Sequence, residues 1–172
     1  GNHGSSSVSA FATDLTTADS SVKVEGKYSA KLQSKKIVIK FAAGNLFIGK
    51  YLDTQKMNGI LGWGRSFTSR PVALTGYIRY TSGTVDNGGK YIENGEQDKG
   101  QVFIALGDWE GQTYGGETWP LIVDTRDAAT FFDPKGDNVI AYGEQTWDSS
   151  TEGENMHPFV IRLNYSLELQ VL

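Results

Sequence analysis

The chain of 172 residues contains no cysteine and only two histidines, His3 and His157. Without cysteine it can form neither a disulfide nor a thiolate metal site. One histidine lies in the leader and the other directly before Pro158, so they make a poor zinc set or catalytic triad. Phosphate-cradling and dinucleotide-binding fingerprints are also missing. Zinc, nucleophilic and nucleotide-dependent chemistries are therefore disfavoured.

Long apolar runs and an excess of positive charge are missing too. No run reaches the roughly 20 residues that span a bilayer, and residues 1–7 lack the charged and apolar regions of a signal peptide. The formal net charge of -4 would repel a phosphate backbone. We expect no membrane-spanning segment in this chain and no nucleic-acid partner.

The chain is instead rich in glycine and aromatic residues, with 21 Gly, 8 Tyr, 8 Phe and 4 Trp. This composition suits a turn-rich all-β protein. One helical turn is expected within residues 124–130. Strands are predicted at residues 27–35, 37–42, 46–51, 72–82, 101–109, 121–125, 138–144, 159–165 and 167–172. This spacing favours an antiparallel β-sandwich, as a jelly roll or a Greek key.

The domain organisation follows from the same pattern. Residues 1–21 are rich in Ser, Thr and Ala with little periodicity, and they predict a flexible leader or an edge strand. Residues 22–172 predict one sandwich domain, because a chain of this length fills a single core.

The stretch from Gly59 to Gly83 contains the most informative pattern. Gly62-Trp63-Gly64-Arg65 sets an indole between two residues without side chains. The Trp63 ring therefore either folds onto the core or stands ready for a flat ligand. The strand that follows places Leu74, Gly76 and Ile78 on one face, together with Val72 and Tyr80.

Several aromatic residues lie beside polar ones in a way that is typical of sugar-binding surfaces. The apolar face of a sugar ring stacks on an aromatic ring, while its hydroxyls need hydrogen-bond donors and acceptors. Core or loop packing is the alternative for each tryptophan. The candidate carbohydrate-binding residues are Trp63, Arg65, Asp108, Trp109, Tyr114, Glu117 and Trp119.

A catalytic alternative uses paired carboxylates on either side of a glycosidic bond. Asp108 and Glu110 are two residues apart, and two residues along a strand span about 6.6 Å, which suits a glycoside hydrolase or lyase. Asp124 or Glu144 could also supply one member of a pair. Simple solvated carboxylates are the competing interpretation.

Oxygen ligands gather in the turn formed by Asp133, Gly136, Asp137 and Asn138. They could hold a structural calcium ion, although a plain type I turn explains the same residues. Apart from this possible calcium ion, we expect no cofactor and no metal site.

Taken together, several motifs of this sequence resemble the putative carbohydrate metabolism domain family over roughly residues 22–163. They are GKYSAKL (26–32), KFAAGNLFIGKY (40–51), GILGWGR (59–65), FTSRP (67–71), GYIRY (76–80), DKGQVFIAL (98–106), VIAYGE (139–144) and DSS (148–150).

The resemblance implies a jelly-roll domain similar to carbohydrate-binding modules, in exported proteins of glycan-degrading gut bacteria. It implies a place at the outer membrane or cell surface, with lipid anchoring through a removed N-terminal segment. It brings no established catalytic mechanism. The family pattern continues past the strand matching residues 159–165 with a glycine-rich loop and a final strand ending in paired aspartates. With Leu172 as the last residue, we expect a sandwich that lacks this strand and exposes a sheet edge.

Three functions follow from these observations. We favour non-catalytic binding of a polysaccharide or oligosaccharide within a surface polysaccharide-utilisation complex, beside other glycan-binding proteins. A glycoside hydrolase or lyase is the first alternative. A structural or adhesin-like surface protein, whose aromatic residues only pack, is the second.

Overall fold

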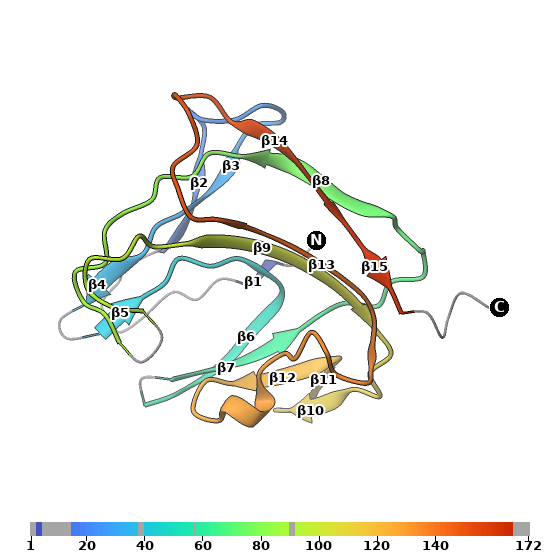
Figure 1. The fold of residues 1–172 in the computed structure, drawn as a ribbon. Coiled ribbons are helices and arrows are strands. Elements are labelled where there is room, and N and C mark those ends of the chain that lie inside the picture. Colours follow the sequence, from blue (N-terminus) through green and yellow to red (C-terminus); the bar gives the residue numbers. More distant parts are fainter. Residues whose placement is uncertain (1–2, 5–14, 38–39, 57, 90–91, 167–172) are drawn as a thin grey trace. The chain divides into compact units, whose positions relative to one another are not determined.

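The computed structural model describes residues 3–4, 15–37, 40–56, 58–89 and 92–166 (Figure 1). These residues fall into two compact units, one of Gly1–Ser20, Tyr28–Ser69 and Asp108–Asn138 and one of Ser21–Lys27, Arg70–Gly107 and Val139–Leu172. The boundaries of a leader and a single domain stay a prediction. No helix in the described part of the chain is long and apolar enough to cross a membrane.

The first unit is built around a four-stranded antiparallel sheet of order β1-β6-β7-β12. Antiparallel pairs β2-β3, β4-β5 and β10-β11 complete its strands. Its elements are β1 (His3–Gly4), β2 (Thr16–Asp19), β3 (Ser29–Leu32), β4 (Lys35–Ile37), β5 (Lys40–Ala42), β6 (Phe47–Gln55), β7 (Asn58–Trp63), β10 (Gln112–Tyr114), β11 (Glu117–Trp119), β12 (Leu121–Asp124) and the 3-10 turn η2 (Ala128–Thr130).

The second unit contains the antiparallel sheet β15-β13-β9 and the antiparallel pair β14-β8. Its elements are β8 (Ala73–Ile78), β9 (Gly100–Gly107), β13 (Val139–Trp147), β14 (His157–Arg162) and β15 (Asn164–Tyr165). All strand pairs described in both units are antiparallel, and η2 is the only helical element among the described residues. The all-β class is confirmed and fits a β-sandwich, whereas the jelly-roll connectivity stays a prediction.

Buried apolar side chains hold each unit together. In the first unit Leu15, Ile60, Leu61, Trp119 and Val123 are buried, and a fully buried Leu or Ile contributes about 1.5–3 kcal/mol. In the second unit the buried side chains are Ala141, Ile161 and Leu163.

The rings of Trp147 and Phe159 meet edge to face in the second unit, with their centroids 5.8 Å apart. Phe159 also covers Gly76 of the paired strand, where an added Cβ would lie 2.8 Å from the ring. Gly76 therefore leaves room for the Phe159 ring, which packs against Trp147 of β13.

Most predicted elements are present, with these corrections. The strand predicted at residues 37–42 is divided between β4 and β5, which pair with each other. The strand predicted at residues 159–165 is divided between β14 and β15, which pair with β8 and β13 respectively. The alternation along β8 is confirmed from Leu74 to Ile78, but Val72 precedes the strand and is exposed. The segment ending in Trp63, where no strand was predicted, is strand β7. The strand predicted at residues 101–109 ends at Gly107. The strand predicted at residues 167–172 lies outside the described residues.

Candidate functional site

A β-hairpin formed by β10 and β11 carries three of the predicted binding residues. Its turn is Gly115-Gly116, whose φ angles of 56° and 82° are those that a type I′ turn requires. Tyr114 pairs directly with Glu117, and Gln112 pairs with Trp119. Because directly paired residues share a face, these four side chains lie on one face of the hairpin.

That inner face contacts strands β6 and β7 of the main sheet. The Tyr114 hydroxyl donates a hydrogen bond of 2.5 Å to Oδ2 of Asp53. Lys50 Nζ lies 2.5 Å from Oε1 of Glu117. The Trp119 ring covers Gly62 so closely that an added Cβ would lie 2.5 Å from it. Three contacts therefore fix the hairpin to the sheet.

Asp53 is the centre of a small hydrogen-bond network. Its Oδ2 accepts a second bond from Gln55 Nε2 at 2.6 Å, and its Oδ1 accepts the backbone N–H of Thr54 at 2.7 Å. The hydrogen bond from Tyr114 is the largest of the effects that lower the pKa of Asp53. The same bond raises the pKa of Tyr114. Asp53 is therefore an ionised acceptor whose orientation is fixed.

A second carboxylate, Asp124 at the end of β12, is bound by Arg126. Arg126 Nε donates to Asp124 Oδ1 at 2.9 Å and Arg126 Nη2 to Oδ2 at 2.5 Å, a bidentate arrangement. These hydrogen bonds lower the pKa of Asp124. Thr130 Oγ1 accepts the backbone N–H of Asp124, and Asp127 caps η2 by accepting from Ala129 N. The loop after β12 is therefore held in one conformation.

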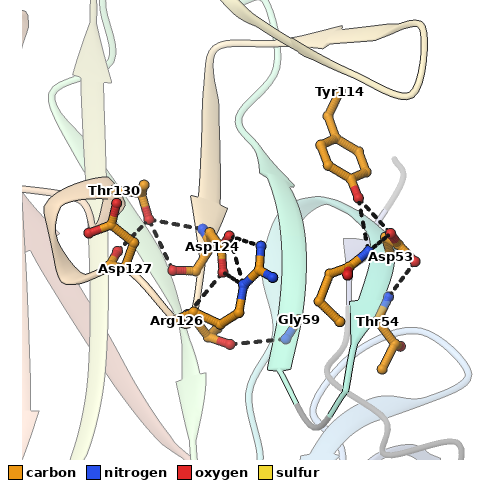
Figure 2. Close-up of polar contacts among 10 residues, drawn as sticks. Asp53, Thr54, Gly59, Tyr114, Asp124, Arg126, Asp127 and Thr130 are labelled. Carbon is orange, nitrogen blue, oxygen red and sulfur yellow. Dashed lines mark hydrogen bonds and ion pairs between the residues drawn. The ribbon is translucent and has the colours of Figure 1, made fainter.

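Asp53 and Asp124 lie on opposite sides of β7, as Figure 2 shows, and the register of the sheet explains why. Both residues pair with Ile60. The register of β6 shifts between Tyr51 and Asp53, and without that shift Leu52 would stand opposite Ile60. The irregularity thus brings Asp53 onto the row and face of Asp124, roughly 9–10 Å away between Cα positions at the usual strand spacing.

The side chains of Trp63 and Trp119, which both lie next to Gly62, are on opposite faces of the sheet. Trp119 is 7% exposed, and the guanidinium of Arg65 lies 5.3 Å from the centre of its ring. Trp63 follows Gly62 in β7, so its side chain points to the other face of the sheet. There it packs against Phe47, with ring centroids 5.7 Å apart. Trp63 and Trp119 therefore do not form one stacking platform.

Asp108, Trp109 and Glu110 lie in the loop between β9 and β10 rather than in a strand. Asp108 and Glu110 are exposed and Trp109 is half-buried. The backbone N–H of Asp108 donates to Asn138 O at 2.9 Å, which fixes the loop. The strand spacing expected between the two carboxylates does not apply, because β9 ends before them.

The turn considered for calcium is closed by its own residues. Gly136 N donates to Asp133 O at 3.1 Å, and Lys135 N donates to Asp133 Oδ1 at 2.9 Å. Within the described ranges, no group of three or more His, Asp or Glu residues is placed to hold a metal ion. A structural calcium ion stays an untested expectation.

Comparison with known proteins adds the biological context of this geometry. Residues 1–171 match the family described as "putative carbohydrate metabolism domain". The chain belongs to this family. The resemblance seen in the sequence motifs is thereby confirmed. No curated protein and no solved structure matches the chain significantly.

Membership of the putative carbohydrate metabolism domain family indicates a carbohydrate-related role for this chain. Sequence reasoning missed Asp53, Gln55 and Arg126, and it considered Asp124 only as one member of a carboxylate pair. The spacing of Asp124 and Arg126 is a sequence signal for this ion pair, because an aspartate and an arginine two residues apart in a turn can form a bidentate pair. Nothing in the sequence joins Asp53 to Tyr114, since that contact depends on the register of β6.

Proposed function

We propose that this domain binds carbohydrate without cleaving it, through a polar cluster of Asp53, Gln55, Tyr114, Asp124 and Arg126. The observation that carries the proposal is the row of two ionised carboxylates across β7, each bound to its own donor. Sugar hydroxyls both donate and accept hydrogen bonds, so they need such a mixture of groups on a rigid support.

Arg126 leaves room for a ligand in this arrangement. Its Nε and Nη2 bind Asp124, whereas its Nη1 has no hydrogen-bond partner among the described residues. The side chain of Arg126 is about half exposed. A guanidinium whose orientation is fixed by one carboxylate can therefore donate its remaining N–H groups to sugar oxygens.

The electrostatics of the cluster favour binding over hydrolysis. A glycosidase needs one carboxyl group that keeps its proton and donates it to the leaving oxygen. The pKa values of both Asp53 and Asp124 are lowered, by hydrogen bonds from Tyr114 and Arg126 respectively. Neither group is suited to act as the acid at neutral pH.

We also propose that this binding takes place in an exported protein of the outer membrane or cell surface, within a polysaccharide-utilisation complex. The support is the resemblance of the sequence motifs, together with membership of a carbohydrate-related family. The ligand is then a polysaccharide or an oligosaccharide released from one.

Isothermal titration calorimetry with cello-, manno-, xylo- and maltohexaose and with polygalacturonate tests the proposal. Arg126→Gln should weaken one site by at least about tenfold. Arg79→Gln is the matched control, because Arg79 forms a 2.9 Å ion pair with Glu154 in the other unit. Equal binding by the two variants, or no binding by the folded wild type, contradicts the proposal.

An assay for the release of reducing ends distinguishes carbohydrate binding from the alternative, a glycoside hydrolase or lyase. The wild type should release none from the same oligosaccharides. Release that disappears in Asp108→Asn or Glu110→Gln would replace the binding function with hydrolysis.

A further inference from the structure

The polar cluster lies next to a second row of the same sheet. Lys50 of β6 and Ile122 of β12 both pair with Gly62, two residues along β7 from Ile60. Residues two apart in a strand share a face and lie about 6.6 Å apart. The row of Gly62 therefore continues the face that carries the two carboxylates, and all of it belongs to the first unit.

The hairpin of β10 and β11 covers this second row. The Trp119 ring lies on Gly62, where an added Cβ would be 2.5 Å from the indole. Gln112, which pairs with Trp119 in the hairpin, accepts the backbone N–H of Ile122 at 2.7 Å through its Oε1. These contacts fix Trp119 over the row, where it is 7% exposed.

A turn after β7 brings Arg65 back to Trp119. Gly64 has a φ angle of 94°, which favours glycine, and its N–H donates to Ile48 O at 2.8 Å. The guanidinium of Arg65 then lies 5.3 Å from the centre of the Trp119 ring. The backbone turn and the stacked ring together restrict where this cation can lie.

The guanidinium of Arg65 keeps its donors for a ligand. Arg65 is exposed, and it forms no ion pair and no hydrogen bond with the part of the chain that the structure describes. A planar guanidinium binds a carboxylate through two parallel hydrogen bonds, which an uncharged hydroxyl cannot match. The chemistry at this row therefore suits an acidic sugar.

The charged side chains at the two rows cancel, with three carboxylates and three cations. They are Asp53, Asp124 and Glu117, and Lys50, Arg65 and Arg126. Two of the carboxylates are already in ion pairs, one with Lys50 and one with Arg126. The other charges of the chain are screened beyond about 8 Å at physiological ionic strength. An acidic ligand group is therefore not repelled here and finds its counter-ion at Arg65.

We propose that the polar cluster takes oligosaccharides that contain a uronic acid, and that Arg65 binds the uronate carboxylate. This specificity rests on the proposed function, because the neighbouring sugar units of the ligand occupy the cluster itself. Their hydroxyls bind at Asp53 and Arg126, while the carboxylate forms charge-assisted hydrogen bonds with Arg65 one row away. Trp119 is a positioning residue, since it carries the guanidinium.

Calorimetric titration with matched acidic and neutral ligands tests this specificity. One pair is tetragalacturonate and its methyl ester, and the other is xylotetraose with and without a glucuronosyl branch. In at least one pair the wild type should bind the acidic member about tenfold more tightly than the neutral one. This preference should shrink at high salt, because it depends on charge.

Arg65→Gln should remove the preference and leave the binding of the neutral ligand unchanged. Arg70→Gln is the matched control, because Arg70 is also exposed and its guanidinium lies 4.5 Å from the centre of a ring, that of Tyr165, in the other unit. Arg65→Lys keeps the charge but loses the planar fork, so its preference should lie between those of Arg65→Gln and the wild type. It also replaces Arg65→Gln if that variant changes the near-ultraviolet circular dichroism of the tryptophans.

The outcomes separate this specificity from the proposed function. If Arg126→Gln weakens every ligand while Arg65→Gln and Arg65→Lys keep the full preference for the acid, Arg65 is refuted and the proposed function stands. If Arg65→Gln removes the preference but Arg126→Gln changes nothing, the proposed function fails, and the specificity assigned to its cluster fails with it. No preference for the acidic member in either pair also overturns the role of Arg65.

Discussion

Asp53 and Asp124 stand opposite the same residue, Ile60, from the two strands that flank β7. Each carboxylate has its own donor, the Tyr114 hydroxyl for Asp53 and the Arg126 guanidinium for Asp124. One row of the sheet therefore holds two anions that are both oriented and both kept ionised.

Replacing Tyr114 by Phe should raise the pKa of Asp53 toward its ordinary value. The variant keeps the ring but removes the hydroxyl, which is the main cause of the lowered pKa. The measurement is the pH titration of the Asp53 carboxyl carbon by NMR. Tyr28→Phe is the control, because Tyr28 is exposed and far from Asp53 in the sequence. An Asp53 titration that is the same in Tyr114→Phe and wild type would show that the bond does not form in solution.

The salt link between Arg126 and Asp124 should make stability depend on pH in a defined direction. Because the folded-state pKa of Asp124 is lowered from 3.8, its contribution is present above the unfolded-state pKa and is lost as the pH falls through the folded-state pKa. Arg126→Gln should therefore be less stable than wild type at pH 7, and this difference should shrink as the pH falls below about 4.

Urea unfolding at a series of pH values measures that difference. Arg79→Gln serves as the comparison, because Arg79 also forms an ion pair with an exposed carboxylate, that of Glu154. A stability difference between Arg126→Gln and wild type that stays constant from pH 7 to pH 3 would contradict the role given to Asp124.

Close packing of Trp119 on Gly62 should make this glycine irreplaceable. An added methyl group would lie 2.5 Å from the indole ring, which itself is buried between Gly62 and Arg65. Gly62→Ala should destabilise the protein by about 1–3 kcal/mol, because overpacking forces the ring or strand to move. Gly83→Ala is the control, since no heavy atom lies within 4 Å of its added Cβ. Equal midpoints for the two variants in urea would refute the packing.

The sequence predicted the fold class better than it predicted the site. The alternation in β8 and the helical turn within residues 124–130 are local patterns, and both appear in the structure. Strand β7 was missed because glycine has low strand propensity, and β7 contains Gly59 and Gly62. Gly62 is needed in β7 because the Trp119 ring of a hairpin distant in the sequence packs on it. No local sequence pattern contains this contact.

The candidate site shows the same limit. Tyr114 and Glu117 were found because aromatic and polar residues lie side by side in the sequence. Their partners Asp53 and Lys50 lie in β6, and the row that holds Asp53 depends on an irregular register between Tyr51 and Asp53. A one-residue shift in register moves a side chain to the other face of the sheet, so strand periodicity alone could not place Asp53 beside Tyr114.

Ile60 should be the residue on which the row between the two carboxylates depends for its stability. It is 2% exposed, and its backbone pairs with both Asp53 and Asp124. Ile60→Ala removes buried methyl groups and leaves a cavity, which costs about 2–5 kcal/mol. Ile48→Ala is the matched control in the neighbouring strand, because Ile48 is 60% exposed and should lose less than about 0.5 kcal/mol. Urea unfolding gives both values.

Because a loosened β7 would also misplace Asp53 and Asp124, Ile60→Ala should bind hexasaccharide more weakly at the polar cluster while Ile48→Ala binds normally. Equal stability of the two variants would show that Ile60 does not support this row.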